Sequence, residues 1–146
     1  EKEKEELGAV LFDKPHMLEH LKEGTLPRKF RVLLPPLDAN GTPIAVKADP
    51  FDPDGNMLAL LKAQRNGNMF PLESKEPRYE NGNYHLNFKG RVTVPSVKNF
   101  QLTSPDDVDH IVCQFGKVGD DEFNLDYRAP INAFQAFSIA MAQFHF

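Results

Sequence analysis

Two histidines and a glutamate form the pattern in this sequence that comes closest to a catalytic motif. His16, Glu19 and His20 fit H-x-x-E-H, the zinc-binding pattern of one class of peptidases. Histidines four residues apart share one face of a helix, where they could bind zinc while the glutamate activates water. The flanking signals, however, predict a helix of only about nine residues, and no third ligand is evident. We therefore interpret the match as chance on a solvated helix face, and we predict no metal site and no cofactor.

Three aspartates within residues 49–54 precede Gly55 in an arrangement like the start of a calcium-binding loop. Such a loop has glycine at its sixth position and needs Asp and Glu at its first and twelfth positions. Counting from Gly55 places Pro50 and Leu61 at those two positions. The segment is therefore predicted to be an acidic turn.

Cys113 is the only cysteine of the chain. A disulfide within the chain is therefore impossible, which fits a reducing compartment such as the cytosol or nucleus. The residue stands in an apolar segment without a basic neighbour in sequence, so we predict a buried structural thiol and not a nucleophile. The sequence also has no Gly-rich phosphate loop and no local signature of a Ser–His–Asp arrangement. These features predict a protein that is not an enzyme.

Basic residues could bind an anion without any bond chemistry. Each of them is most simply an outward-facing strand residue that keeps an edge soluble. Clustered Lys and Arg also attract acidic lipid, with about 1 kcal/mol each near a membrane surface. Two such groups occur: Arg28, Lys29 and Arg31 with Lys22 nearby, and Lys89, Arg91 and Lys98.

The overall charge and hydropathy exclude two classes of protein. The formal net charge is −4, so the chain has no general basic field for nucleic acid, and direct binding to nucleic acid is not expected. No apolar run reaches the roughly 18–20 residues that a membrane-spanning helix needs. Any contact with a membrane is therefore expected to be peripheral.

The elements that position these residues are predicted to be mainly short strands, because Pro and Gly separate short apolar runs. Phe30, Val32 and Leu34 alternate with their neighbours and predict a strand, while Asn81-Gly82 predicts a hairpin. Residues 57–62 favour a short helix. Further strands are predicted over residues 7–12, 91–102, 110–115 and 123–127, with a bulge or bend at Pro95 and a short helix over 15–23.

The last segment, residues 131–146, contains no Lys, Arg, Asp or Glu. On a helical wheel Phe134, Phe137, Met141 and Phe144 line one side, and Ile139 lies on the other side among the few polar residues. A helix that is apolar nearly all round must be enclosed, and this one is too short to span a bilayer. A sheet that encloses a helix must curve and close. The sequence therefore predicts antiparallel strands wrapped around a C-terminal helix, with the phenylalanine side enclosed.

Three long segments resemble the tubby family. Residues 86–101 (LNFKGRVTVPSVKNFQ) resemble the family signature, residues 114–130 resemble the block that follows it, and residues 131–144 resemble the terminal hydrophobic helix. The segments EELGAVLFD and PRKFRVLLP resemble the parts of the domain upstream. The resemblance covers most of the chain, which we interpret as the C-terminal portion of a tubby domain, forming a single domain over residues 1–146.

The resemblance implies a fold and a function. Tubby domains are closed antiparallel barrels around a hydrophobic C-terminal helix, and they bind phosphatidylinositol bisphosphate through a basic site. The expected function is that of a peripheral membrane adaptor in signalling or ciliary trafficking, located in the cytoplasm and at the plasma membrane, with the nucleus and the cilium as further locations. Its expected partners are a phosphoinositide headgroup on the inner membrane surface and trafficking or signalling proteins. The alternative is a transcription-associated regulator in the nucleus or a protein-interaction module.

The chain also departs from the family pattern. The first strands, with most of the phosphate-binding Lys and Arg, are not part of it, so the headgroup contacts that we predict are Lys4, Arg28 and Lys29. Pro95 replaces a small residue of the signature. An incomplete barrel exposes strand edges and half of the helix surface. We therefore expect a second chain, a swapped copy or an upstream segment to complete it.

Overall fold

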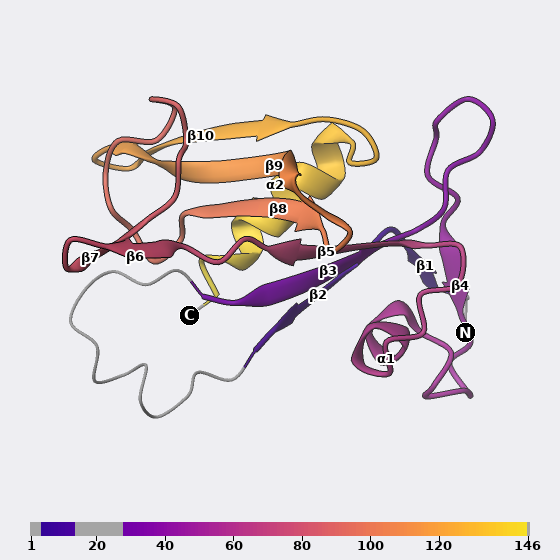
Figure 1. Ribbon diagram of the computed structural model, residues 1–146. Coiled ribbons are helices and arrows are strands. Elements are labelled where there is room, and N and C mark those ends of the chain that lie inside the picture. Colours follow the sequence, from indigo (N-terminus) through magenta and orange to yellow (C-terminus); the bar gives the residue numbers. More distant parts are fainter. Residues whose placement is uncertain (1–3, 14–27, 146) are drawn as a thin grey trace.

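The structure is a computed structural model that describes residues 4–13 and 28–145 (Figure 1). Six of its strands form one antiparallel sheet in the order β10-β9-β8-β5-β3-β2, while β1 pairs with β4 and β6 pairs with β7. The elements are β1 (Lys4–Glu6), β2 (Ala9–Phe12), β3 (Phe30–Leu34), β4 (Val46–Ala48), α1 (Met57–Lys62), β5 (Phe70–Ser74), β6 (Arg78–Glu80), β7 (Asn83–His85), β8 (Phe100–Ser104), β9 (Asp107–Gly119), β10 (Glu122–Tyr127) and α2 (Ala133–Ala142).

Most of the predicted elements are confirmed. The strand over residues 30–34, the hairpin at Asn81-Gly82 and the helix over 57–62 all occur where the sequence places them. Asn81 and Gly82 both have positive φ angles, 52° and 82°, as a tight two-residue turn requires. The helix predicted over residues 15–23 lies outside the described residues.

The long strand predicted over residues 91–102 is wrong for most of its length. Only the residues from Phe100 onward join the sheet, as part of β8. The preceding residues cross over β9 and pair with it, among the described residues, only through one isolated bridge between Val94 and Lys117. Pro95 follows this bridge and has no N–H for a ladder, which explains why the pairing stops there.

The crossing segment fits closely against β9 because of a glycine. A Cβ atom on Gly116 would lie only 2.4 Å from the side chain of Val92, so a larger residue would push the segment away. Asn99 fixes the same crossing, since its side chain accepts from the backbone N–H of Lys117 and donates to the carbonyl oxygen of Val94. The segment therefore has a defined path without being a strand.

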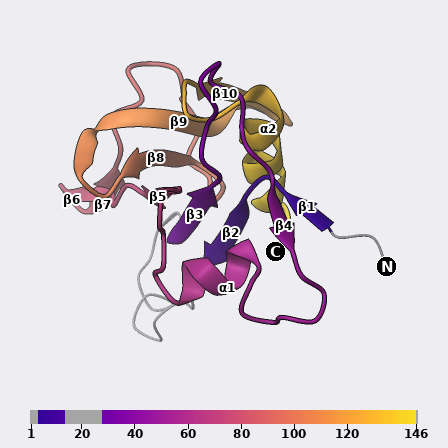
Figure 2. The same cartoon turned by 90° about the vertical axis from the view of Figure 1, so that its right-hand side faces the viewer.

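The main core lies between the sheet and α2 (Figure 2). Aromatic rings run across the strands from Phe12 and Phe30 through Phe100 to Phe115 and Phe123, with neighbouring ring centroids 4.9–5.8 Å apart. Such pairs stabilise the core beyond the area that they bury, by about 0.5–1.5 kcal/mol each. This row joins five strands of the sheet into one packed unit.

A second, smaller core lies on the opposite face of the sheet. Leu33 points away from Val32 and Leu34, and it packs with Met57 and Leu61 of α1. Asn56 begins α1, because its side chain accepts from the backbone N–H of Ala59. Both faces of the sheet are therefore covered in part, by α2 on one side and by α1 on the other.

The mainly β fold class is confirmed, and the sheet is open, as in an incomplete barrel, with β2 and β10 at its two edges. The predicted enclosure of the phenylalanine side of the terminal helix is wrong in this chain. Phe134 and Phe137 are 65% and 57% exposed, whereas Ile139 is 3% exposed and faces the sheet. The small side chains of Ala136 and Ala140 let the helix backbone approach the strands closely, and the bulky residues point outward.

Candidate functional site

Six charged side chains line a groove on the face of the sheet opposite α2. The register pairs Arg31 of β3 with Glu73 of β5, and Glu73 with Thr103 of β8. The groove has a volume of about 470 Å³. Its lining residues are Asp13, Lys29, Phe30, Arg31, Glu73, Ser74, Lys75, Glu76, Thr103 and Val108.

Each cation of this groove faces a carboxylate. Lys29 Nζ lies 2.6 Å from Glu76 Oε1. Two looser pairs, each at 3.8 Å, join Arg31 to Asp13 and Lys75 to Asp109. The hydrogen bond from Lys29, together with its charge, lowers the pKa of Glu76. The groove is therefore a charge-balanced surface, and an anion that binds there has to compete with these carboxylates.

The three residues predicted to contact a headgroup do not form one patch. The β2–β3 register pairs Ala9 with Leu33 and Phe12 with Phe30, so the start of β2 lies beside the end of β3. Lys4 precedes β2 and lies in β1, whereas Arg28 and Lys29 precede β3 and lie at the opposite end of these strands (Figure 1). Arg28 Nη1 donates to the carbonyl oxygen of Gln143 at 3.4 Å, near the end of α2.

The structure describes only some of the other candidate residues that the sequence suggested. His16, Glu19 and His20 lie outside the described residues. Within residues 4–13 and 28–145, no group of three or more His, Cys, Asp or Glu side chains is arranged to hold a metal ion. The acidic turn is confirmed, since Asp49 and Asp52 each accept a backbone N–H two residues ahead.

Cys113 is a buried thiol, as predicted. It is 1% exposed and lies in the main core. Burial, together with the charge of Asp126, raises its pKa to about 12. A thiol with such a pKa carries almost no thiolate at neutral pH, so it is chemically inert in the folded protein.

The three residues of the second predicted basic group, Lys89, Arg91 and Lys98, do not share one site in the structure. Lys98 places its ammonium 5.2 Å from the ring centroid of Phe144, in a cation–π contact. Lys89 and Arg91 instead line a cavity of about 230 Å³ together with Arg128. Arg128 was missed by the sequence analysis, because it follows β10 and only the sheet register brings it near residues 89–91.

Arg91 has the best-defined side chain of this cavity. Its Nε and Nη2 donate to the two carboxylate oxygens of Asp126 at 3.0 and 2.8 Å. Hydrogen bonds from Arg91, and to a smaller extent from Gln114, lower the pKa of Asp126. A bidentate pair of this kind fixes the orientation of the guanidinium group.

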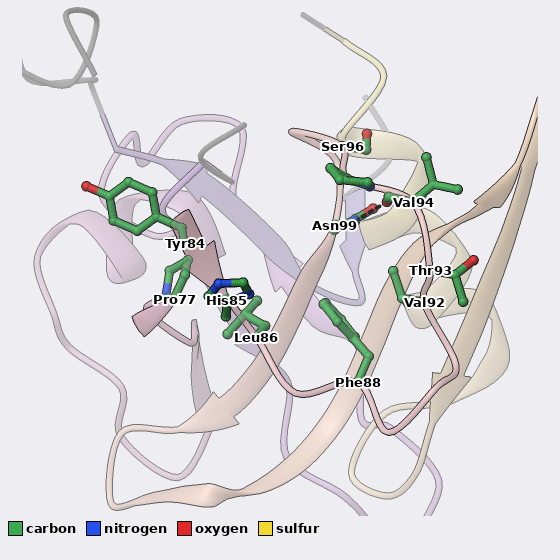
Figure 3. A pocket seen from close by; sticks show the side chains of 11 residues that line it. Pro77, Tyr84, His85, Leu86, Phe88, Val92, Thr93, Val94, Ser96 and Asn99 are labelled. Atoms are coloured by element: carbon green, nitrogen blue, oxygen red, sulfur yellow. Dashed lines mark hydrogen bonds between the residues drawn. The ribbon is translucent and has the colours of Figure 1, made fainter. Parts of the chain in front are cut away.

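A further cavity of about 230 Å³ lies beneath the segment that crosses β9 (Figure 3). Tyr84, His85 and Phe88 line one side of it, and residues 92–96 line the other. Its polar groups hold the backbone, because Asn99 binds Val94 and the Ser96 hydroxyl accepts from the N–H of Lys98. The arrangement supports the crossing segment.

The outward side of α2 forms an apolar surface beside an open strand edge. A cavity of about 210 Å³ lies between β2 and α2. Leu7 before β2, Val10 of β2 and Val32 of β3 line it on one side, and Phe134 and Ile139 of α2 on the other. In the part of the chain that the structure describes, no helix is long and apolar enough to cross a membrane.

The sequence of this chain is similar to those of known proteins over its whole length. The family model described as "Tub family" matches residues 1–146. Tubby-related protein 2 of Homo sapiens is 39% identical over 144 residues, which cover 97% of this chain and 26% of that protein. Tubby-related protein 3 of Homo sapiens is 42% identical and Protein king tubby 1 of Aedes aegypti is 43% identical, each over 81% of this chain and over 27% and 29% of their own lengths. The chain thus spans about a quarter of the length of these relatives, and none of their names denotes an enzyme.

Proposed function

Because the chain belongs to the Tub family, we propose that it is part of a non-enzymatic binding module that attaches to phosphoinositide headgroups and links a membrane to trafficking or signalling proteins. The observation that carries this proposal is the family match over all 146 residues. The resemblance of the signature segment to tubby domains supplies the class of ligand. The expected site is a cytoplasmic membrane surface.

The phosphate contacts that we propose are Lys4, Arg28 and Lys29; Arg28 and Lys29 share one headgroup, and Lys4, at the opposite end of β2 and β3, contacts another. Phosphate oxygens accept strong, charge-assisted hydrogen bonds from Lys and Arg, and no bond is made or broken. The pair between Lys29 and Glu76 is solvent-exposed, with side chains 49% and 71% exposed, so it is weak and easily displaced. A phosphate group can therefore replace Glu76 as the partner of Lys29.

Vesicle co-sedimentation of the full-length protein tests this proposal. Binding is expected to phosphatidylcholine vesicles that contain phosphatidylinositol bisphosphate, and not to phosphatidylcholine alone. Replacing Lys4, Arg28 and Lys29 with Gln is expected to weaken binding, whereas Glu76→Gln is expected to strengthen it. The matched control replaces Lys62, Arg65 and Lys117, three cations that lie on α1, after α1 and on β9. The proposal is wrong if the unaltered protein does not bind the bisphosphate vesicles, or if the control triple loses as much binding. A salt-dependent DNA titration tests the nuclear alternative.

We also propose that further β-strands from outside this chain cover the outward side of α2. The open edges at β2 and β10 and the exposed Phe134 and Phe137 support this proposal. Unpaired strand edges bind additional strands, and exposed apolar surfaces of this kind mark contact sites. A dye that fluoresces on apolar surfaces should bind residues 1–146 strongly and the full-length protein weakly. Equal dye binding per mole by both would contradict the proposal.

A further inference from the structure

Lys89, Arg91 and Arg128 come from two separate segments and line the same cavity, between the loop over residues 87–91 and the end of β10. We propose that this cavity binds a single phosphoryl group, presented either by a soluble phosphate ester or by a lipid headgroup. The site is distinct from the proposed contacts Lys4, Arg28 and Lys29.

A chain of side-chain hydrogen bonds orients Arg91 at the cavity. Gln101 is 1% exposed, and its Nε2 donates to Gln114 Oε1 at 3.1 Å. Gln114 Nε2 in turn donates to Asp126 Oδ2 at 2.9 Å. Asp126 accepts both hydrogen bonds of Arg91. This chain of side chains crosses β8, β9 and β10 and ends at the guanidinium group, so the orientation of Arg91 is set by bidentate hydrogen bonds within the protein.

Hydrogen bonds to its backbone define the conformation of the loop over residues 87–91. Lys89 and Gly90 both have positive φ angles, 51° and 81°, and the N–H of Arg91 donates to the carbonyl oxygen of Phe88. The N–H of Lys89 also donates to the side chain of Asn87. Asn124 of β10 also supports the loop, because its Nδ2 donates to the carbonyl oxygen of Arg91 at 2.8 Å. The position of Lys89 is therefore set by the backbone, which lowers the entropy cost of ligand binding.

The lining of the cavity carries more positive than negative charge. Lys89, Arg91 and Arg128 face one carboxylate, Asp126, so the lining has an excess of two positive charges in a chain with a net charge of −4. Arg91 spends two of its five N–H groups on Asp126 and keeps three. Among the described residues, the side chains of Lys89 and Arg128 make no hydrogen bond or ion pair. This differs from the groove around Lys29, where every cation has a carboxylate partner.

The size of the cavity favours a compact ligand. The cavity, at about 230 Å³, is smaller than the roughly 300–1,000 Å³ typical of sites for drug-sized ligands. It suits one compact oxyanion whose ester substituent points to solvent. A phosphomonoester, with up to two negative charges, matches the excess charge of the lining.

The test uses the full-length protein and two probes, soluble inositol 1,4,5-trisphosphate in calorimetry and bisphosphate-containing vesicles in co-sedimentation. The double variant Lys89→Gln and Arg128→Gln is expected to bind the soluble trisphosphate at least about tenfold more weakly, because two phosphate-binding charges are lost. The matched control, Lys62→Gln and Arg65→Gln, removes the same charge from exposed positions on and after α1 and should change little. Thermal unfolding of each variant checks that folding is intact, and the charge reversals Lys89→Glu and Arg128→Glu provide a second, stronger test.

The outcomes separate the two sources of phosphate and the two proposed sites. Loss of both soluble and vesicle binding in the Lys89/Arg128 variant assigns the site to a lipid headgroup, and loss of soluble binding alone assigns it to a soluble ester. Retained trisphosphate affinity, or an equal loss in the control pair, overturns the inference. If the triple variant of Lys4, Arg28 and Lys29 still binds vesicles as well as the unaltered protein, only the proposed contacts of those three residues are contradicted. The two proposals can therefore fail independently.

Discussion

The two sides of helix α2 are both uncharged, yet they have opposite environments. The side facing the sheet carries Ala136, Ile139 and Ala140 together with two buried glutamines, and all five residues are at most 4% exposed. The outward side carries Phe134 and Phe137, which are more than half exposed, together with the partly exposed Met141. The most hydrophobic side of this helix is therefore the one that the sheet leaves open.

The difference shows that size and local hydrogen bonding decide which side of such a helix meets the sheet. Gln135 can be buried because its Nε2 donates to the carbonyl oxygen of Leu7 at 2.8 Å and its Oε1 accepts from the N–H of Asn132. The side-chain Nε2 of Gln143 donates to the carbonyl oxygen of Ile139. Buried amides with partners cost little. The large rings on the outward side then remain available to a covering segment.

The strongest test of this comparison is a pair of alanine substitutions on opposite sides of α2. Ile139→Ala should reduce the free energy of unfolding by about 2–5 kcal/mol, because it removes buried methyl groups and leaves a cavity under the helix. Phe137→Ala should change it by about 0.5 kcal/mol or less, although it removes a larger side chain, because the ring faces solvent. Urea unfolding of residues 1–146 measures both. Equal costs for the two variants would mean that the outward side is already packed in this chain.

A substitution of intermediate effect tests the role of the buried amide. Gln135→Ala removes a capping-box partner of Asn132 and leaves the carbonyl oxygen of Leu7 without its donor. The expected loss is about 1–3 kcal/mol in the free energy of unfolding. Ser138→Ala provides the control on the exposed side, because its hydroxyl only returns to the carbonyl oxygen of Phe134. A cost for Gln135→Ala no larger than that of the control would show that the amide is not needed to seat the helix.

The sequence allowed the fold class, the hairpin, α1 and the strand over residues 30–34 to be predicted, since each has a local signal. The orientation of α2 could not be predicted from hydrophobicity, because both of its sides are apolar enough to be buried. The path of residues 91–99 depended on Gly116, a residue of the next strand against which Val92 packs.

The charged residues were identified by type and not by partner. The pairs Lys29–Glu76 and Arg91–Asp126 join segments that are 47 and 35 residues apart in the chain, so they depend on the sheet register. Arg128 entered its cavity for the same reason. Sequence clusters of basic residues therefore gave the chemistry of a candidate site, and the topology decided which of them share a surface.

The smallest expected effect is the pH dependence of stability that comes from the Arg91–Asp126 pair, on the face of the sheet opposite α2. The pKa of Asp126 is lowered from its ordinary value of 3.8, mainly by the hydrogen bonds from Arg91. A carboxyl whose pKa is lower in the folded state stabilises the fold above its unfolded pKa, and this contribution is lost as the pH falls through the folded pKa. Arg91→Gln should therefore reduce stability slightly at neutral pH, and the difference from the unaltered chain should shrink below about pH 4.

The same acid titration should leave the contact of α2 unchanged, because neither side of that helix carries a charged group. The cost of Ile139→Ala should accordingly be as large at acid pH as at neutral pH, as long as the chain remains folded. Urea unfolding of both variants at several pH values measures this contrast. A cost of Ile139→Ala that fell with pH in parallel with that of Arg91→Gln would mean that the helix and the ion pair unfold through a shared charged contact. That result would contradict the expectation that the apolar face under α2 and the polar face around Arg91 stabilise the fold independently.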